Sequence, residues 1–341
     1  MTTESRTRRL PPTLEEVAAA AGVSRSTVSR VVNGSTKVSP EVVENVNAAI
    51  ERLNYVPNRA ARSLVNRQTM AIALVVPEET SRFFGDPYFA EVVHGIAHAM
   101  ESSDYVLNLH VASRFAPNSK TTKYLRDGNV DGAIVVSHHS SDIFLSGLGD
   151  TLPVVFGGRP INSDQPNVYY VDVDNAEAAA MGTRHLIGLG RTRIATIAGP
   201  ADMPAGIDRT AGWHRALAEA GIEHDLIEHG DFTVAGGARA MRALLDRDPS
   251  IDAVFVASDL MATGAVTVLR QLGKSIPGDI AIVGFDDSPA ATGGDVQLTT
   301  VLQPSREMGE KMASMLIARL RGEETDRVYI MGTRLVKRDS A

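Results

Sequence analysis

Short apolar runs alternate with helical stretches from Met70 onward, and this alternation constrains the fold more than any other feature. The apolar runs span residues 70–76, 105–111, 131–136 and 153–156, and then 168–171, 193–198, 252–257 and 280–285. Helical periodicity fills the intervals near 88–103, 119–128 and 141–148, and around 175–190, 207–220, 234–247 and 259–272. Continuous Val, Ile and Ala runs between helices are typical of parallel strands buried on both faces. Two such series predict two doubly wound α/β lobes with a cleft between them.

Residues 13–33 predict a pair of short helices. Thr13 and Glu16 have the spacing of a capping box, in which each side chain bonds the backbone N–H of the other residue. Gly22 can adopt the left-handed conformation that ends a helix, and Ser24 can cap the next one. Two short helices joined by a turn that contains glycine form a helix-turn-helix.

The second helix of this pair leaves polar side chains on its outer side, namely Arg25, Ser26, Ser29, Arg30 and Asn33. Cationic and short hydrogen-bonding side chains at the N-terminal end of a helix suit reading of the DNA major groove. For an isolated helix pair the alternative is an ordinary charged surface helix. Ser39-Pro40-Glu41 predicts the cap and first turn of a third helix, which can close a small core over the first two.

Charge is unevenly spread along the 341 residues. Residues 1–70 hold ten Lys and Arg against six Asp and Glu, whereas the whole chain has a formal net charge of −7. A basic N-terminal region on an acidic remainder favours a polyanion-binding module joined to a part that binds no polyanion. The absence of cysteine excludes disulfides and thiolate metal sites. With no secretory h-region and no long apolar run, we expect a cytoplasmic protein without a membrane partner.

Residues 13–67 closely resemble the DNA-binding headpiece and hinge of the LacI/GalR family of transcriptional regulators. The resemblance rests on the motifs T-L-x-x-V-A-x-x-A-G-V-S, T-V-S-R-V-V-N, V-S-P-E and L-N-Y-V-P-N-R-A-A-R-S-L, which follow one another in fixed order. It extends over the rest of the chain, to the periplasmic-binding-protein-like core of the same family. It implies that the chain crosses back near Leu302–Pro304, so that a helix at 304–321 rejoins the first lobe.

The expected domain organisation follows from this resemblance together with the basic N-terminus. We expect a disordered basic arm at 1–12, a helix-turn-helix domain at 13–57, a hinge helix and linker at 58–68, and an effector-binding and dimerisation core at 69–341. Within the core we expect a first lobe of about 69–172 and 304–332, and a second lobe of about 173–303 and 333–341.

The resemblance also implies which residues contact DNA. Arg25, Ser26 and Arg30 are expected to read base edges. The residues expected to face the DNA backbone are Thr13, Ser24, Asn33, Ser39, Tyr55 and Asn58. Leu64 matches the leucine that wedges into the minor groove, with Ala61 beside it, and an apolar wedge of this kind kinks the duplex. The alternative for Leu64 is a position at the start of the core.

Polar and aromatic side chains follow the predicted strands, at the edge where such sheets bind ligands. The expected effector-binding residues are Tyr88, Phe89, His138, Arg159, Asp174, Arg209, Ser258, Asp286 and Gln303. Tyr88 and Phe89 lie in a segment similar to the N-P-F-F of the family, and position in the resemblance favours Arg209 and Asp286 most. Carboxylates, a guanidinium and hydroxyls around aromatic rings suit a polyhydroxy ligand. Ser258 stands where family members often have Asn. Two residues have an alternative to effector binding: Asp286 can cap the following helix, and Arg159 can pair with an acid at the lobe edge.

Other classes of protein fit the sequence less well. His138-His139 has no third ligand at metal spacing, so we expect neither a metal nor a cofactor. Phosphate-loop, nucleophile-elbow and zinc-peptidase motifs are absent, so we expect no enzyme activity. The core alone would also suit a periplasmic transport receptor, but the basic N-terminal region and the missing signal peptide argue against it.

These observations predict a homodimeric repressor that responds to a small molecule. One recognition helix reads only a half-site, so a two-fold dimer matches a palindromic operator. The pieces D-M-P-A-G-I-D-R, V-F-G-G-R-P and S-H-H-S-S-D look like those of actinobacterial sugar regulators, including cellobiose-type ones, and the effector is therefore expected to be a sugar. The alternatives are a cytoplasmic sugar-binding protein, or a regulator that answers to a nucleoside or purine and is co-repressed rather than induced.

Overall fold

The computed structural model describes residues 12–32, 35, 37–55, 68–111, 120–142, 145, 147–161, 163–223 and 225–341. The chain divides into two compact units, residues 1–69 and 70–341. Each unit has an apolar core of its own, a small one in the first and a larger one in the second.

The N-terminal unit consists of three helices, α1 (Leu14–Ala21), α2 (Arg25–Val32) and α3 (Pro40–Leu53). The predicted capping box is present, since the Thr13 amide donates to the Glu16 carboxylate at 2.7 Å and the Glu16 amide donates to the Thr13 hydroxyl at 3.3 Å. Gly22 ends α1 with a φ of 68°, as its position predicted. The Thr27 amide donates to the Ser24 hydroxyl at 3.1 Å, so Ser24 caps α2. The two helices and their turn are therefore those that the sequence indicates.

The third helix begins at Pro40, but its cap differs from the prediction. Ser39 occupies the N-cap position and its side chain makes no capping hydrogen bond. Pro40 sets the start instead, because its ring fixes a helical φ and it has no N–H that needs a partner. The core that the three helices close contains Val17, Val28 and Val46, all fully buried.

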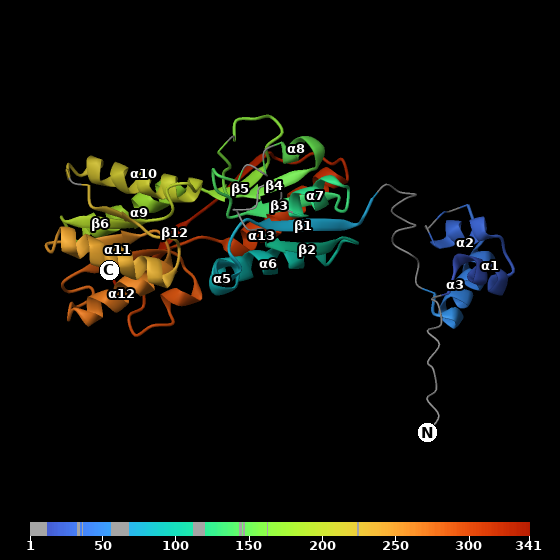
Figure 1. The fold of residues 1–341 in the computed structure, drawn as a ribbon, viewed down its shortest axis with the longest axis horizontal. Coiled ribbons are helices and arrows are strands. Elements are labelled where there is room, and N and C mark those ends of the chain that lie inside the picture. The colour runs from blue at the N-terminus through green and yellow to red at the C-terminus, as the bar shows by residue number, and fades with distance from the viewer. Residues whose placement is uncertain are drawn as a thin grey trace, which may run out of the picture. The chain divides into compact units, whose positions relative to one another are not determined.

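The C-terminal unit holds two six-stranded sheets, one in each lobe (Figure 1). In the first lobe all strands run parallel, in the order β11 (Val328–Met331), β5 (Tyr170–Val173), β4 (Val154–Gly157), β3 (Gly132–Val136), β1 (Ala71–Val76) and β2 (Val106–Val111). The helices of this lobe are α5 (Thr80–Gly85), α6 (Pro87–Met100), α7 (Lys120–Arg126), α8 (Leu148–Thr151) and α13 (Ser305–Leu320). Strands β1 and β3 are buried along their whole length, as their continuous apolar runs predicted.

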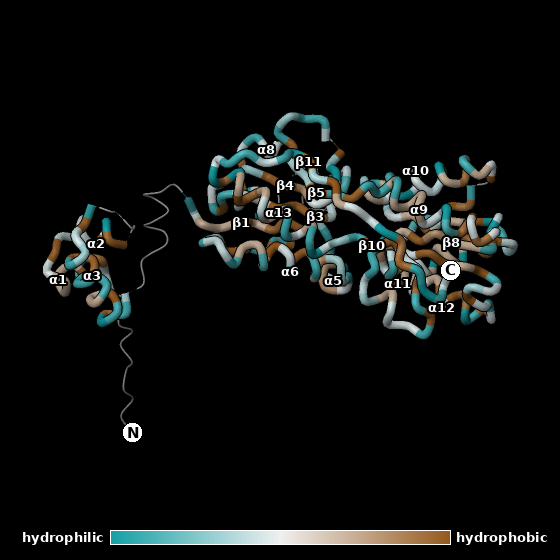
Figure 2. The backbone as a smooth tube through the Cα atoms, turned by 180° about the vertical axis from the view of Figure 1, so that it is seen from behind, coloured by the Kyte–Doolittle hydropathy of each residue, from teal (hydrophilic) through white to brown (hydrophobic). Residues whose placement is uncertain are grey.

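The sheet of the second lobe has the order β12 (Arg334–Val336), β10 (Thr299–Leu302), β9 (Ala281–Asp286), β8 (Ala253–Val256), β6 (Ile194–Ala198) and β7 (Ile227–His229). Its helices are α9 (Asn175–Gly188), α10 (Pro204–Glu219), α11 (Val234–Arg247), α12 (Asp259–Gln271) and the short η2 (Pro289–Ala291). The prediction of parallel sheets is confirmed except at β12, which pairs antiparallel with β10 at the edge of the sheet. Hydrophobic segments run through both sheets (Figure 2).

Two predicted elements differ from the structure. The strand expected at 168–171 begins at Tyr170 and continues to Val173, because its register is set by β4 and β11 on its two sides. The helix expected at 141–148 falls partly outside the described residues, and the helix seen nearby, α8, starts only at Leu148. The short strands β7, β10, β11 and β12 were not predicted.

The chain passes between the lobes after β5, after β10 and after β11. The second of these crossings lies at the predicted place, and α13 then packs along α6 of the first lobe. Gly95 of α6 and Gly309 of α13 allow this contact, because a Cβ on Gly95 would lie 1.9 Å from the Arg306 carbonyl oxygen. The crossings put the carboxyl ends of both sets of strands at the boundary between the lobes.

The described helices all lack the length and apolar character that crossing a bilayer requires.

Candidate functional site

A cleft lies at the boundary between the two lobes of the C-terminal unit. Both apolar and polar side chains line its walls, as they do in small-molecule sites. Its walls come from strand ends and helix starts of both lobes, including β1–α5, β3, β4 and β5 on one side and α10, α12 and β9 on the other. A ligand there would touch both lobes at once.

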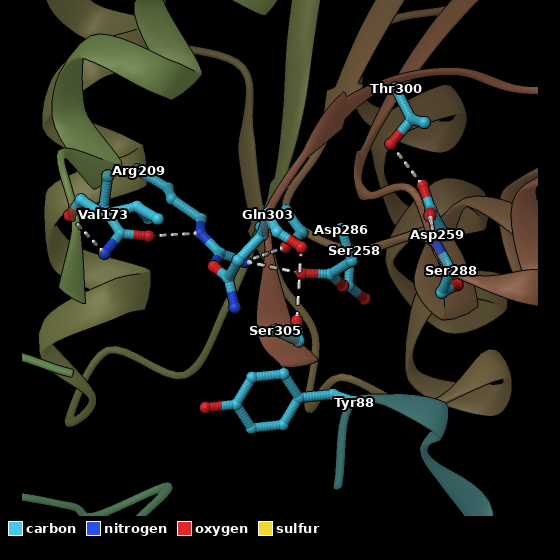
Figure 3. Close-up of polar contacts among 12 residues, drawn as sticks. Tyr88, Val173, Arg209, Ser258, Asp259, Asp286, Ser288, Thr300, Gln303 and Ser305 are labelled. Atoms are coloured by element: carbon cyan, nitrogen blue, oxygen red, sulfur yellow. Dashed lines mark hydrogen bonds and ion pairs between the residues drawn. The ribbon is translucent and has the colours of Figure 1, made fainter. Parts of the chain in front are cut away.

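Arg209 of α10 lies at the centre of this cleft, and three hydrogen bonds fix its guanidinium (Figure 3). Its nitrogens donate to Asn175 Oδ1 at 2.8 Å, to the Ala257 carbonyl at 2.7 Å and to Gln303 Oε1 at 2.9 Å. The guanidinium also stacks on the Phe285 ring at 3.5 Å from the centroid. Because burial opposes the charge, the pKa of Arg209 is lowered from its ordinary value. A cation held this rigidly is preorganised to bind oxygens of a ligand.

Asp286 stands beside Arg209 at the end of β9, with 3.9 Å between its Oδ1 and Arg209 Nη1. Its backbone has a φ of 107°, and Asp287 follows with a φ of 55°, so two consecutive non-glycine residues adopt a left-handed φ. Such strained positions cluster at functional sites, where the surrounding structure holds them. Burial raises the pKa of Asp286 well above its ordinary value, although the Arg209 charge opposes the rise.

Two further buried carboxyl groups lie in or behind the wall of the cleft. Asp172 of β5 accepts from the Arg159 amide at 2.7 Å and from Asn175 Nδ2 at 3.0 Å, and burial raises its pKa. Asp259 accepts from the Thr300 hydroxyl at 2.6 Å and from the Ser288 amide at 2.8 Å, and burial raises its pKa to about 6 (Figure 3). Asp259 thus supports the β9 end from behind, whereas Asp172 faces the cavity.

Most of the residues expected to bind an effector are brought together here. The cleft is lined by Tyr88, His138, Arg159, Arg209, Ser258, Asp286 and Gln303 among others. Phe89 and Asp174 do not line it. Phe89 points into the apolar core, where it is 1% exposed, because the helix turns it by about 100° from its neighbour Tyr88 on α6. Asp174 is exposed and caps α9, accepting from the Glu177 amide at 2.8 Å.

The two alternatives raised for Arg159 and Asp286 have different outcomes. Arg159 does pair with an acid of the other lobe, since its guanidinium makes a bidentate contact with Asp208 of α10 at 2.8–3.2 Å. It lines the cleft as well. The helix-capping role considered for Asp286 belongs to its neighbour Ser288, whose hydroxyl accepts from the Ala290 amide at the start of η2.

Several lining residues are not among the expected effector-binding residues. They include Arg82, Asp86, Ser137, Asp172, Asn175, Met203 and Phe232. Asp172 and Ser137 follow strands and carried a signal, since both stand at carboxyl ends of apolar runs. Arg82 lies on the short helix α5, which has no clear periodicity, and its guanidinium lies 5.0 Å from the Phe232 ring of the other lobe. A contact between distant segments leaves no local pattern.

His138 is buried in the wall of the cleft and stays neutral at ordinary pH. Burial lowers its pKa to about 4. Its Nε2 lies 3.3 Å from the Arg159 carbonyl oxygen, which can only accept, so this nitrogen carries the hydrogen. Within the described part of the chain no group of three His, Cys, Asp or Glu side chains could hold a metal ion.

The N-terminal unit offers a second functional surface, on α2. Arg25, Ser26 and Arg30 are all exposed on this helix, while Val28 is fully buried. The Arg25 guanidinium lies 3.2 Å from the Glu15 carboxylate, and both side chains are largely exposed. Thr13, Ser24 and Ser39 are exposed as well. This face can present cationic and hydroxyl groups to a polyanion.

Other residues expected at this surface have different positions. Tyr55 is 8% exposed and belongs to the three-helix core, because it follows the left-handed Asn54 that ends α3 and its ring folds back onto the helices. Asn33, Asn58, Ala61 and Leu64 lie outside the described residues.

Comparison with known proteins gives matches over the whole chain. A family model described as bacterial regulatory proteins, lacI family, matches residues 13–58, and one described as a periplasmic binding protein-like domain matches residues 183–341. The HTH-type transcriptional regulator CelR of Thermobifida fusca is 45% identical over 337 residues, which cover 98% of this chain and 99% of that protein. The HTH-type transcriptional repressor PurR of Erwinia tasmaniensis is 32% identical, over 96% of this chain and 97% of its own.

Two solved structures are similar over nearly the full length. A transcriptional regulator CelR–cellobiose complex shares 43% identity with a TM-score of 0.77, and the match covers 97% of this chain and 100% of that chain. A lac repressor dimer bound to operator and the anti-inducer ONPF shares 28% identity with a TM-score of 0.84, covering 97% and 99%. The match to both therefore includes the N-terminal helices as well as the two-lobed core.

Proposed function

This chain belongs to the LacI family of bacterial regulatory proteins and is a DNA-binding transcriptional regulator rather than an enzyme, and from that premise we propose that it is a repressor controlled by a β-linked glucose disaccharide. The observation that carries the proposal is the fixed guanidinium of Arg209 beside Asp286 and Asp172 in a cleft between lobes. Charged groups of both signs on rigid elements suit vicinal hydroxyls, which donate and accept at once.

On the effector side, we propose that Arg209, Asp286 and Asp172 bind sugar hydroxyls. Tyr88 and Phe232 line opposite parts of the same cleft and supply apolar faces for the C–H surfaces of a sugar ring. The remaining proposed contacts are Arg82, His138, Arg159, Ser258 and Gln303. We choose cellobiose as the sugar to test, because the CelR structure contains it and the match to that chain is nearly complete.

On the DNA side, we propose that Arg25, Ser26 and Arg30 read base edges in a major groove. Thr13, Ser24, Asn33, Ser39 and Asn58 are proposed to face the backbone, and Leu64 with Ala61 to enter the minor groove. One recognition helix covers a half-site, so we propose a homodimer on a palindromic operator, as in the lac repressor dimer structure. Because a bacterial regulator of this kind binds operator DNA, we propose that the protein is located in the cytoplasm.

For the domain organisation, we propose that 13–57 is the DNA-binding domain, 58–68 the hinge and 69–341 the effector-binding and dimerisation core. The division of the chain at residues 69 and 70 supports the start of that core. We propose that the chain changes lobe near residues 172, 303 and 332. The membership of β5 and β11 in the first sheet and of β12 in the second supports these lobe boundaries.

The purine-type alternative is less favoured. The relatives named PurR are 30–32% identical to this chain, against 45% for CelR. Asp172, Asp286 and Arg209 in this cleft suit the vicinal hydroxyls of a sugar, which a purine base lacks.

Calorimetry on the full-length protein tests the effector, with cellobiose, ribose and hypoxanthine as probes. An operator is first selected from a random duplex library, and binding to it is then followed by fluorescence anisotropy with each probe. We expect a palindrome, cellobiose binding, and weaker operator binding when cellobiose is present. Binding of hypoxanthine with tighter operator binding would support the purine alternative instead.

A further inference from the structure

We propose that Glu78, His139 and Asp202 form a protonated bridge between the two lobes, which couples closure of the cleft to uptake of one proton. Glu78 and His139 follow β1 and β3 of the first lobe, and Asp202 precedes α10 of the second lobe. The three residues are called the interlobe bridge below. They lie beside the effector cleft, and the coupling to sugar rests on the function proposed for that cleft.

The geometry requires a charged histidine. His139 Nε2 lies 3.1 Å from Glu78 Oε1, and His139 Nδ1 lies 2.9 Å from Asp202 Oδ1. Carboxylate oxygens can only accept, so both ring nitrogens must donate, and only the imidazolium form carries two N–H groups. A neutral ring would leave a lone pair facing a carboxylate in a site where the His139 side chain is 1% exposed.

The charged groups around His139 agree with this protonation state. Glu78 and Asp202 face its ring, Asp142 accepts from its backbone amide at 2.7 Å, and His138 beside it in sequence is neutral. Burial opposes the charge of His139, but its hydrogen bonds to the two carboxylates outweigh burial and raise its pKa. Burial would also raise the pKa of Glu78, and its bonds from His139, Arg82 and Ser137 lower it instead.

A neutral ring has only one N–H, so loss of the proton removes the positive charge from both contacts of His139 and leaves only one of the two hydrogen bonds. Glu78 keeps two other partners when His139 is neutral, the Arg82 guanidinium and the Ser137 hydroxyl, which donates at 2.7 Å. Both belong to the first lobe, as does His139. The contact between the His139 ring and the Asp202 carboxylate crosses to the second lobe, so loss of the proton weakens the connection between lobes.

The direction of the effect follows from this arrangement. The pKa of His139 is higher with the lobes together than with Asp202 withdrawn, so closure is favoured at low pH and loses this contribution as pH rises through the higher value. If sugar binds the closed cleft, its affinity falls over the same range, by at most about tenfold per pH unit for one linked proton.

The first test needs no sugar. In an NMR titration of histidine-labelled full-length protein, with His139 assigned by the signal missing from His139→Gln, we expect a pKa above the ordinary value of about 6.5. Asp202→Asn should lower it by about one pH unit, since removal of one nearby opposite charge has effects of this size. The matched control is Asp208→Asn, which removes another interlobe carboxylate, the partner of Arg159, and should leave the pKa of His139 unchanged.

Two results of this titration would overturn the bridge. One is an ordinary or lowered pKa for His139 in the wild-type protein. The other is an equal fall in Asp202→Asn and Asp208→Asn, which would mean that general loosening of the lobes moves the pKa. Asp202 is 34% exposed in its side chain, so we expect Asp202→Asn to fold. Where His139→Gln does not fold, the His139 signal is assigned through its couplings to the backbone instead.

The second test measures the coupling by calorimetry with cellobiose near pH 7, in two buffers of different ionisation enthalpy. We expect more proton uptake in the wild type and in Asp208→Asn than in Asp202→Asn. Asp172 and Asp286 also have raised pKa values in the cleft, and the comparison between the two variants separates their protons from that of His139. Equal proton uptake in the wild type and in Asp202→Asn would refute the coupling. A wild type that does not bind cellobiose would instead refute the proposed effector, while the titration still decides the bridge.

Discussion

Asp286 combines a strained backbone with a buried carboxyl group whose pKa is raised, which is an unfavourable combination for stability. An acid that holds its proton more tightly in the folded chain than in the unfolded chain destabilises the fold as pH rises past its ordinary value. The residue therefore adds nothing to stability at neutral pH. Its position beside Arg209 is better explained by a contact with a ligand.

We predict that Asp286→Asn separates these two effects. The amide keeps the shape but lacks the charge, so cellobiose affinity should fall about 10- to 100-fold, the range for a charge-assisted hydrogen bond. The melting temperature should stay the same or rise at pH 8. Calorimetry and thermal denaturation measure the two quantities, with Asp295→Asn, an exposed acid paired with Arg270, as the control. Unchanged cellobiose affinity in Asp286→Asn would show that this carboxyl group does not contact the sugar.

Arg30 is the exposed cation in the last turn of α2. We predict that Arg30→Ala weakens operator binding by about 1–3 kcal/mol and relaxes specificity at one base pair in each half-site. Lys37→Ala removes the same charge outside α2 and should weaken operator and random duplex alike, mainly at low salt. Anisotropy titrations on both duplexes compare the two variants. An Arg30→Ala protein with wild-type discrimination would mean that bases are read elsewhere.

Whether the sequence predicts a residue of the cleft depends on how far apart in the sequence the contacting residues lie. Arg209 and Asp286 follow from position in the family pattern, and the structure brings them together with Gln303. Arg82 becomes a lining residue only because β1 and β6 end near the same boundary, which no local pattern encodes. Phe89 was expected in the cleft together with its neighbour Tyr88. It lies in the core instead, because two adjacent residues on one helix cannot both face the same side.

At the scale of elements, the crossing of α6 and α13 anchors the returning chain to the first lobe. A Cβ on Gly309 would lie 2.3 Å from the Val92 carbonyl oxygen of α6. The partner atom is backbone and cannot rotate away. The two helix axes would have to separate to accept any side chain at this position.

We predict that Gly309→Ala destabilises the core by about 1–3 kcal/mol, as overpacking does, even though alanine favours helix formation. Gly188→Ala is the matched control, because a Cβ there meets no atom within 4 Å and its φ is not left-handed. That variant should be neutral or slightly stabilising. Urea denaturation of both variants measures the difference, and equal stability would contradict the close approach of α6 and α13.

Elements that the sequence predicts well are those with a strong pattern along one segment. The buried strands β1, β3 and β9 and the long helices α11 and α12 appear within a residue or two of the expected bounds. Strands β10, β11 and β12 were missed because they are short and two of them, β11 and β12, are edge strands with exposed residues. Their place comes from pairing with distant strands, such as β11 with β5.

At the scale of the whole molecule, the regulator has two units with separate cores, and the segment that links them lies outside the described residues. A ligand in the core can change DNA binding only by binding one lobe arrangement better than the other. Nearly complete switching requires a difference of about 5.5 kcal/mol between the two arrangements. The interlobe bridge and the Arg159–Asp208 pair are among the contacts between lobes that such a difference would act on.

The last prediction concerns Leu64, which the family resemblance assigns to a minor-groove wedge. We expect Leu64→Ala to lose specific operator affinity, because the kink that the wedge produces is what rewards the correct site. The non-specific, salt-sensitive binding supplied by the basic residues of 1–70 should remain. Cellobiose should then have little further effect on DNA binding, since the step it controls is already lost, while its affinity for the core stays at the wild-type value. Titrations on operator and random duplex at two salt concentrations, with and without cellobiose, measure all of these quantities. A Leu64→Ala protein that still discriminated operator and still released it with cellobiose would show that the signal reaches DNA by another route.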